Sequence, residues 1–379
     1  MTFQPQHLLA PLAWETFLSD TWEKTHLHLP GRGKGYYDRL FRKQDVDALV
    51  PLAVGERGVR LARDGQKSEV PNDAPALYRA YQEGSTVVIN RLHRMWRSVN
   101  LFCLALEELL HHPTGVNLYL TPPQARGFGA HYDTHDVFIL QISGRKIWDL
   151  YGVHCELPLE SQKVALPADI GAPRHTLELE PGSLLYMPRG LIHSARTAED
   201  SSSLHLTLGI HVLRWGDLMA QALDLARLEQ LDFRRALPVG FLSKSPRELA
   251  GQLSVLLGKF AQVGGGTGAV SSLAELLFSR TPSPIDSHFS VLDNLADLNP
   301  ATLLRKRTGT LCYFYEEGEQ VVLRFSGGTV SMPKRIQKSL EFILRSDWFT
   351  VASIPGLDAA GQLVLARRLI REGLLTIVD

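Results

Sequence analysis

The sequence contains few cysteines. Its 379 residues include three, Cys103, Cys155 and Cys312, which lie far apart and form no Cys-x-x-Cys motif. A chain of this length with so few thiols does not carry a disulfide framework, and it lacks the cysteine spacing of a structural zinc site. This cysteine content is typical of a reducing compartment and therefore favours the cytoplasm.

The sequence also lacks an excess of charge and long apolar runs. Lys and Arg number 40, Asp and Glu also number 40, and the formal net charge is zero. No overall field therefore draws the protein to nucleic acid or to a membrane. No stretch approaches the roughly 20 apolar residues of a membrane span, and the segment from Met1 to Pro5 does not begin a signal peptide. We expect no membrane association and a cytoplasmic location.

Two metal-binding residue types stand close together near the middle of the chain. His131 and Asp133 are separated by one residue, so on an extended backbone their side chains leave the same face and can bind one ion. An imidazole and a carboxylate suit iron(II), zinc or manganese. Chance alone gives roughly 1.5 such spacings in a chain of this composition. By itself such a pair is more often a surface or hydrogen-bonded pair than a metal site.

A hairpin follows this pair. Val137 to Ile142 is a run of β-branched and aromatic residues, Ser143 and Gly144 supply a turn, and Ile147 to Tyr151 returns as a second strand. Lys146 lies where the returning strand begins. Considered alone, Lys146 is a solvated lysine beside a turn.

A third ligand comes from a later strand. Ser183 to Met187 reads as a strand, Pro188 to Gly190 as a turn, and the strand that starts at Leu191 carries His193. Two histidines and one carboxylate on one side of a metal, with the opposite positions open, form the facial triad of non-haem iron(II) oxygenases. The sequence therefore predicts a metal site built from His131, Asp133 and His193.

The same segments resemble a known family. The resemblance is carried, in chain order, by Asn117-Leu-Tyr-Leu-Thr-Pro-Pro123, His131-Tyr-Asp133, Gly144-Arg-Lys146-Ile-Trp148 and Pro181-Gly-Ser-Leu-Leu-Tyr-Met-Pro-Arg-Gly-Leu-Ile-His193. They look like the JmjC-type ribosomal oxygenases of bacteria and animals, which are iron(II)- and 2-oxoglutarate-dependent protein hydroxylases. The match runs in order through the middle of the chain and extends more weakly towards both ends.

The resemblance implies a role for each matching residue. His131, Asp133 and His193 match the catalytic iron triad of the family. Lys146 matches the basic residue that pairs with the distal carboxylate of 2-oxoglutarate, a position where animal members have lysine and some bacterial members arginine. Asn117 and His205 match polar positions near the cosubstrate. The alternative for His205 is a core histidine with a satisfied hydrogen bond.

The order of elements predicts a mixed α+β chain. Strands and turns recur between Gly115 and Val212, which indicates an all-β sandwich or barrel. With the resemblance, we expect a double-stranded β-helix, the jelly roll of the cupins, in an oxygenase domain spanning residues 1–215. Helical patterns from Trp14 to Val50 and from Leu101 to His111 are expected to pack on it, whereas the segment from Leu52 to Glu83 is polar and mixed.

Residues 216–297 read as a helical region. Leucines recur at helical spacing from Gly216 to Ala236, and Ser245-Pro-Arg-Glu248 opens a second helix that runs through Phe260. The glycine-rich segment from Gly264 to Gly268 has no following Gly-Lys-Ser/Thr, so we interpret it as a connector and not as a phosphate loop. In the family that the chain resembles, this region forms a homodimer interface, which implies a dimer here.

Residues 298–379 read as a small mixed unit. We expect a helix through Arg307, strands from Leu311 to Tyr315 and from Val321 to Phe325, a helix from Lys334 to Arg345, and a last helix capped by Asp358. This order is compatible with the winged-helix domain of the family. From Leu298 onward, eleven Lys and Arg stand against eight Asp and Glu. So small an excess does not support direct binding of nucleic acid.

These observations predict an iron(II)- and 2-oxoglutarate-dependent dioxygenase that uses O2 to hydroxylate a protein side chain. By resemblance, the substrate is a histidine or an arginine of a ribosomal protein. Two alternatives remain open. The first keeps the chemistry and changes the substrate to a free amino acid or a natural-product peptide. The second is a non-catalytic cupin and winged-helix regulatory protein.

Overall fold

The computed structural model describes residues 2–55, 58–63, 66–68, 73–125, 128–198, 201–263, 266–280 and 287–378. The chain divides into two compact units. The first comprises Met1–Val212 with Thr308–Thr310, and the second comprises Leu213–Arg307 with Leu311–Asp379. The finer division into residues 1–215, 216–297 and 298–379 stays a prediction. Within the described residues, no helix combines the length and the apolar composition that a bilayer span requires.

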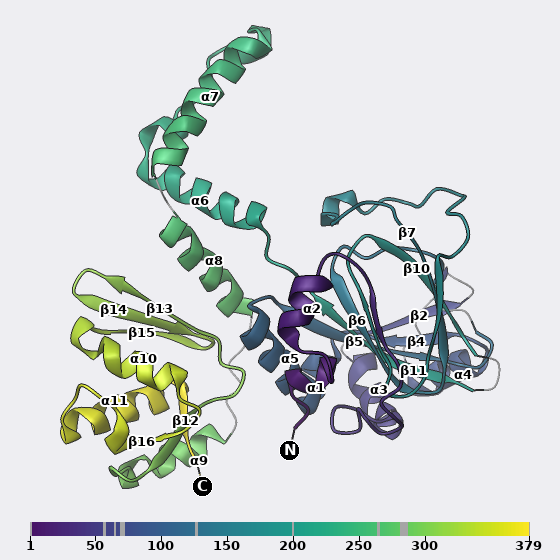
Figure 1. Cartoon of the computed structure of the whole chain (residues 1–379), viewed down its shortest axis with the longest axis horizontal. Coiled ribbons are helices and arrows are strands. Elements are labelled where there is room, and N and C mark those ends of the chain that lie inside the picture. Colours follow the sequence, from purple (N-terminus) through teal and green to yellow (C-terminus); the bar gives the residue numbers. More distant parts are fainter. Residues whose placement is uncertain are drawn as a thin grey trace. The chain divides into compact units, whose positions relative to one another are not determined.

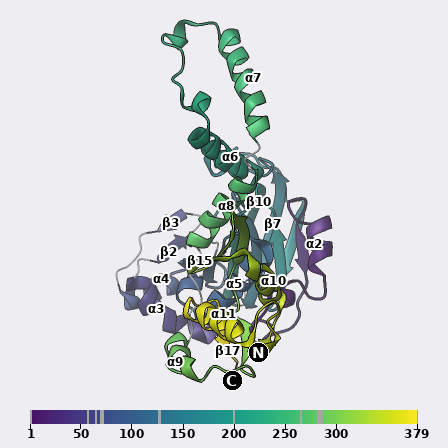
Figure 2. The same cartoon turned by 90° about the vertical axis from the view of Figure 1, so that its left-hand side faces the viewer.

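Two antiparallel sheets form the first unit, as Figures 1 and 2 show. The larger sheet has the order β1-β9-β6-β11-β5-β4-β2-β3, and the smaller has the order β10-β7-β8. The bounds of these strands are β1 Leu27–Leu29, β2 Val59–Arg63, β3 Gln66–Ser68, β4 Thr86–Ile89, β5 Thr114–Thr121, β6 Asp136–Ser143, β7 Lys146–Val153, β8 His175–Leu179, β9 Leu184–Met187, β10 Leu191–Thr197 and β11 Ser203–Ile210.

Apolar residues on both faces of the larger sheet explain its position in the fold. Its outer face packs against the helices around Phe138, Leu140 and Tyr186, all fully buried. Its inner face packs against the smaller sheet through a second cluster that includes Ile139 and Trp148. Because strand residues alternate between faces, the apolar residues 137–140 of β6 contribute to both cores.

The helices of the first unit are α1 Pro5–Leu9, α2 Trp14–Asp20, α3 Val46–Gly55, α4 Ala74–Gln82 and α5 Arg97–Leu110. Figure 1 shows α1, α2 and α5 beside the larger sheet. The predicted helix from Leu101 to His111 is confirmed, and it ends where His111 adopts a left-handed conformation. The interpretation of residues 52–83 as polar and mixed missed β2, β3 and α4. The expected entry from Trp14 to Val50 contains strand β1 as well as helices.

The second unit contains six helices and six strands among its described residues. The helices are α6 Trp215–Glu229, α7 Pro246–Val263, α8 Gly266–Arg280, α9 His288–Asp293, α10 Gln337–Arg345 and α11 Ala359–Arg371, and the strands are β12 Leu303–Lys306, β13 Cys312–Glu317, β14 Gln320–Phe325, β15 Gly328–Pro333, β16 Phe349–Thr350 and β17 Leu375–Ile377. The strands form two sheets, ordered β13-β14-β15 and β16-β12-β17, which share one core with α10 and α11.

Three expectations for this unit have clear outcomes. The predicted helix through Arg307 is wrong, because Leu303–Lys306 is strand β12 and pairs with both β16 and β17. The glycine-rich connector is shorter than expected: residues 264–265 lie outside the described residues, and α8 already begins at Gly266. Asp358 caps α11 as predicted, since its Oδ1 accepts a hydrogen bond of 2.8 Å from the backbone N–H of Gly361.

Candidate metal centre

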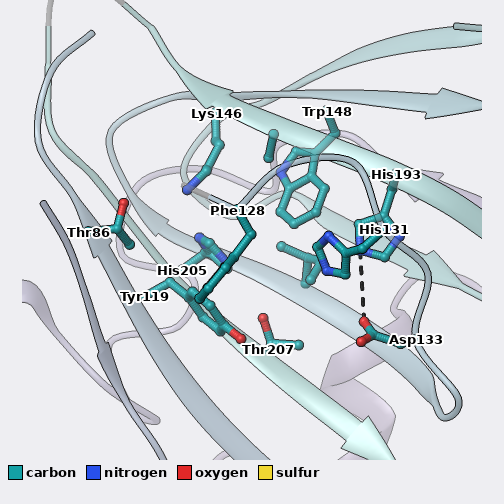
Figure 3. Close-up of a pocket in the computed structure, with 12 residues that line it drawn as sticks. Thr86, Tyr119, Phe128, His131, Asp133, Lys146, Trp148, His193, His205 and Thr207 are labelled. Atoms are coloured by element: carbon teal, nitrogen blue, oxygen red, sulfur yellow. Dashed lines mark ion pairs between the residues drawn. The ribbon is translucent and has the colours of Figure 1, made fainter. Parts of the chain in front are cut away.

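The first unit brings His131, Asp133 and His193 together between its two sheets. His131 and His193 exchange two backbone hydrogen bonds, of 3.0 and 2.8 Å, which hold the two strand segments side by side. Asp133 lies in the segment that leads into β6. One ligand atom from each of the three residues lies within 4.8 Å of the others. Figure 3 shows both imidazoles and the carboxylate converging, with His193 Nε2 3.8 Å from Asp133 Oδ2.

The two imidazoles are held in a metal-binding orientation. Nδ1 of His131 lies 2.8 Å from the carbonyl oxygen of Gly129, and Nδ1 of His193 lies 3.0 Å from that of Leu191. A carbonyl oxygen can only accept, so each Nδ1 carries the proton and donates it. Each Nε2 is left with a free lone pair. Carbonyl contacts of this kind fix the tautomer and the ring direction of metal-binding histidines.

The electrostatics of the cluster favour the forms that bind a metal. Burial lowers the pKa of His193 to about 4, and His131 acts in the same direction. Burial opposes ionisation of Asp133, but the neighbouring charges, led by His193 and followed by His135, His131 and Lys163, together hold the pKa of this carboxyl below its ordinary value. At neutral pH the site therefore offers a neutral imidazole at His193 and a carboxylate at Asp133. Metal binding to these forms displaces no proton from them.

The three residues open onto a cavity of about 490 Å3, its mouth included. Its lining is apolar and aromatic around the triad and polar at the opposite end. The described residues that line it are Thr86, Tyr119, Phe128, His131, Asp133, Ile139, Lys146, Trp148, His193, Ala195, His205 and Thr207. The site thus has a candidate metal at one end, open coordination space in the middle and a cationic group beyond.

Lys146 supplies that cationic group. It is the first residue of β7, is 3% exposed, and donates a hydrogen bond of 2.9 Å from Nζ to Thr121 Oγ1. The Thr121 hydroxyl also lies 3.2 Å from Thr86 Oγ1. Burial lowers the pKa of Lys146 to about 7. A carboxylate delivered to this end of the cavity would hold the ammonium in its charged form and satisfy it.

Two buried polar atoms near Lys146 have no partner within the described residues. They are Nδ1 of His205 and Nε1 of Trp148. The His205 ring stacks on Tyr119, with ring centroids 4.8 Å apart, and contacts Trp148 edge to face. Burial lowers the pKa of His205 well below its ordinary value, and Lys146 acts in the same direction. Unsatisfied polar atoms at a cavity wall fit a ligand with oxygen atoms.

The structure places the cosubstrate candidates differently. Lys146 and His205 line the cavity, whereas Asn117 does not. The Asn117 Oδ1 accepts a hydrogen bond of 2.9 Å from the backbone N–H of Arg91. Tyr119 and Thr121 lie on the same face of β5 at alternate positions, and they reach the cavity wall and Lys146. The sequence could have pointed to both residues. They lie two and four positions after Asn117, and side chains at alternate positions of a strand share a face.

Comparison with known proteins identifies the fold. A model of the JmjC domain matches residues 92–218. The ribosomal oxygenase YcfD of Escherichia coli, solved with cobalt and 2-oxoglutarate, superposes with a TM-score of 0.60 at 19% identity, covering 97% of this chain and 99% of that one. At this identity the likeness shows the fold. Residues 92–218 therefore match a JmjC domain, and the fold is of the cupin type.

Curated relatives place the chain more narrowly. Ribosomal oxygenase 1 of Rattus norvegicus is 35% identical over 286 residues, which make up 68% of this chain and 48% of that protein. The bifunctional lysine-specific demethylase and histidyl-hydroxylase NO66 of Drosophila persimilis is 32% identical over 248 residues, 61% of this chain and 36% of that protein. The chain spans less than half the length of these relatives. The JmjC match, these relatives and the shared fold show that the chain belongs to the JmjC ribosomal oxygenase family.

Proposed function

We propose that this protein is an iron(II)- and 2-oxoglutarate-dependent dioxygenase that hydroxylates a side chain of a ribosomal protein. The observation that carries the proposal is one cavity with a His131, Asp133 and His193 cluster at one end and the buried Lys146 at the other. In this arrangement a metal ion can bind at the triad, and a dicarboxylate can reach from the metal to Lys146. An iron(II) ion in the cluster supplies the oxygen-activating redox chemistry, with 2-oxoglutarate and O2 as cosubstrates.

The chain's own residues position the reactants. Lys146 and the Thr121 hydroxyl bind the distal carboxylate of 2-oxoglutarate, and the unpartnered nitrogens of His205 and Trp148 supply further polar contacts. Each triad imidazole donates its Nδ1 proton to a backbone carbonyl, which directs Nε2 towards the metal. The aromatic wall excludes water from the reacting region and so protects the reaction from side products.

The cavity favours a neutral side chain as substrate. Asp133 is the only carboxylate among the described lining residues, and a bound metal ion neutralises it. A guanidinium entering the cavity would find no carboxylate free to pair with it, because Asp133 and the carboxylates of 2-oxoglutarate are already held by the metal and Lys146. Leaving a buried charge unpaired is costly. An imidazole carries no such cost. We therefore place histidine ahead of arginine, in agreement with the histidyl-hydroxylase name of the NO66 relatives.

The second unit supplies a surface for a second copy of the chain. Helices α6 and α7 expose large apolar side chains, namely Trp215, Met219, Leu223, Leu228, Leu253, Val255 and Leu257. Exposed apolar surface of this extent is typical of an interaction face. We infer that these helices form a homodimer, and that the strands and helices from β12 onward act as a winged-helix-like docking unit.

Intact-mass analysis tests the proposal. Ribosomal proteins from cells that lack the gene are incubated with the purified protein, iron(II) and 2-oxoglutarate. We expect one ribosomal protein to gain the mass of one oxygen atom, with succinate formed in equal amount. His131→Ala should abolish both products, whereas His175→Ala, at an exposed position on β8, should retain them. If the protein turns over only free amino acids or other peptides, it is still an oxygenase, but the proposal of a ribosomal substrate is refuted. The absence of any turnover would refute the oxygenase.

A further inference from the structure

A buried network of charged and polar side chains lies next to the candidate metal centre. Arg189 Nη1 lies 2.7 Å from Asp136 Oδ2 and 2.6 Å from Glu23 Oε1. The Tyr186 hydroxyl donates to Asp136 Oδ1 at 2.9 Å and accepts from the backbone N–H of Glu23 at 3.0 Å. Asp136 is completely buried and Arg189 is 5% exposed. We call these four residues the Asp136 network.

The Asp136 network joins the chain segment that carries Asp133 to the segment that carries His193. Asp136 is the first residue of β6 and follows Asp133 by three positions, and Arg189 lies in the turn four positions before His193. The backbone N–H of Gly190, in the same turn, donates to the carbonyl oxygen of Asp133 at 2.9 Å. The two segments are therefore tied by the backbone hydrogen bonds between His131 and His193, by the one from Gly190 to Asp133, and by the Asp136 network.

The Asp136 carboxylate acts on the main chain as well as on the side chains. Its Oδ1 also accepts from the backbone N–H of Arg189 at 3.3 Å, so one carboxylate binds both the guanidinium and the peptide of the same residue. This arrangement fixes the direction in which the turn leaves β9. Apolar residues of similar size often give equal or greater stability than a buried ion pair, but they do not fix a direction in this way.

We propose that Asp136 and Arg189 are positioning residues that set the separation of Asp133 and His193 before a metal binds. The inference rests on the proposed function, because it assumes that these two side chains hold the metal. Groups that orient metal ligands without touching the ion typically contribute about 10- to 100-fold to metal affinity. The Asp136 network acts on both segments at once, so we expect a contribution of that order.

Cobalt(II) titration of the full chain without oxygen turnover tests the inference. The visible absorption of bound cobalt(II) reports affinity and ligand geometry independently of catalysis. We expect Asp136→Asn to weaken cobalt(II) binding about 10- to 100-fold. The matched control is Asp149→Asn, which breaks an ion pair with Arg196 between β7 and β10 that does not touch the segment from Asp133 to Asp136. The control should keep the affinity and the spectrum of the wild type.

Two further variants separate positioning from stability. Tyr186→Phe keeps the ring and removes one hydrogen bond to Asp136, so it should fold and show a smaller loss of cobalt(II) affinity. The double variant Asp136→Asn with Arg189→Met removes both buried charges and leaves only Glu23, whose side chain is 33% exposed, without its ion-pair partner. It should recover thermal stability relative to Asp136→Asn without recovering cobalt(II) affinity. Cobalt(II) affinity could instead fall in step with the melting temperature across all variants, the Asp149→Asn control included. The Asp136 network would then only stabilise the fold, and its positioning role would be refuted.

The remaining outcomes divide the inference from the proposed function. If the wild type binds no cobalt(II), the metal centre is wrong and the inference falls with it. If the wild type binds cobalt(II) and hydroxylates its substrate while Asp136→Asn binds the metal equally well, the proposed function stands and only the positioning role is refuted.

Discussion

Replacing Lys146 with methionine should change the pH dependence of stability in a direction that the structure fixes. Lys146 is buried, and its hydrogen-bond partner is the Thr121 hydroxyl at 2.9 Å. Methionine has nearly the same length and no charge, and Thr121 keeps its contact with Thr86 at 3.2 Å. The substitution therefore removes the ammonium group with little change in packing.

The magnitude follows from the pKa of the buried amine. Burial lowers the pKa of Lys146 from 10.5 to about 7. Between these pH values the unfolded chain binds a proton that the folded chain does not, so the free energy of unfolding of the cosubstrate-free protein rises with pH. The slope from this residue is at most about 1.4 kcal/mol per pH unit, or roughly 5 kcal/mol over the whole window. Lys146→Met should lack this slope and should be the more stable protein at pH 7.

Chemical denaturation of wild type and variant at about pH 7 and pH 9 measures the effect. The difference between the two proteins isolates Lys146 from Cys103, whose burial raises its pKa to about 12 and affects stability above pH 9. Exposed Lys34→Met is the control and should follow the wild type, because its ammonium stays in solvent on folding. Adding 2-oxoglutarate with a divalent metal should flatten the slope of the wild type. Equal slopes in wild type and Lys146→Met would refute the argument.

Three further substitutions have expected outcomes. Gly144→Ala should lower stability by about 3 kcal/mol or more in thermal melting, because Gly144 has a φ of +66° and a Cβ there would lie 1.8 Å from the Ser202 carbonyl oxygen. Asp358→Ala should cost about 1 kcal/mol in urea denaturation, since it removes the hydrogen bond that caps α11 at Gly361. Leu253→Glu, at a position 56% exposed on α7, should convert the expected dimer to a monomer, as light scattering would show.

The candidate site could be predicted in part because its signals are local. His131 and Asp133 stand two residues apart, and the turn before His193 is marked by Pro188 and Gly190. The structure brings the three side chains within 4.8 Å of one another. Asp133 itself lies outside any strand, so the extended geometry expected for the pair applies only to His131, where the bridge to His193 imposes it.

The parts that the sequence did not predict depend on pairing between distant segments. Leu303–Lys306 consists of residues that favour helices, yet it forms β12 because β16 and β17 supply hydrogen bonds on both of its edges. Tertiary context of this kind routinely overrides local propensity. The same reason applies to β2, whose partner β4 lies beyond the helix α4 in the chain. No local pattern in the segment from Leu52 to Glu83 specifies that partner.

The position of His205 shows how register turns a core pattern into a functional surface. The apolar residues Leu204, Leu206 and Leu208 alternate along β11 and are fully buried in the core beside the helices. Because side chains alternate, His205 and Thr207 must then face the cavity, where both line the wall. A slip of one residue would exchange the two sets and would cost the burial of every leucine. The same apolar pattern that stabilises the sheet therefore also orients His205 beside Lys146.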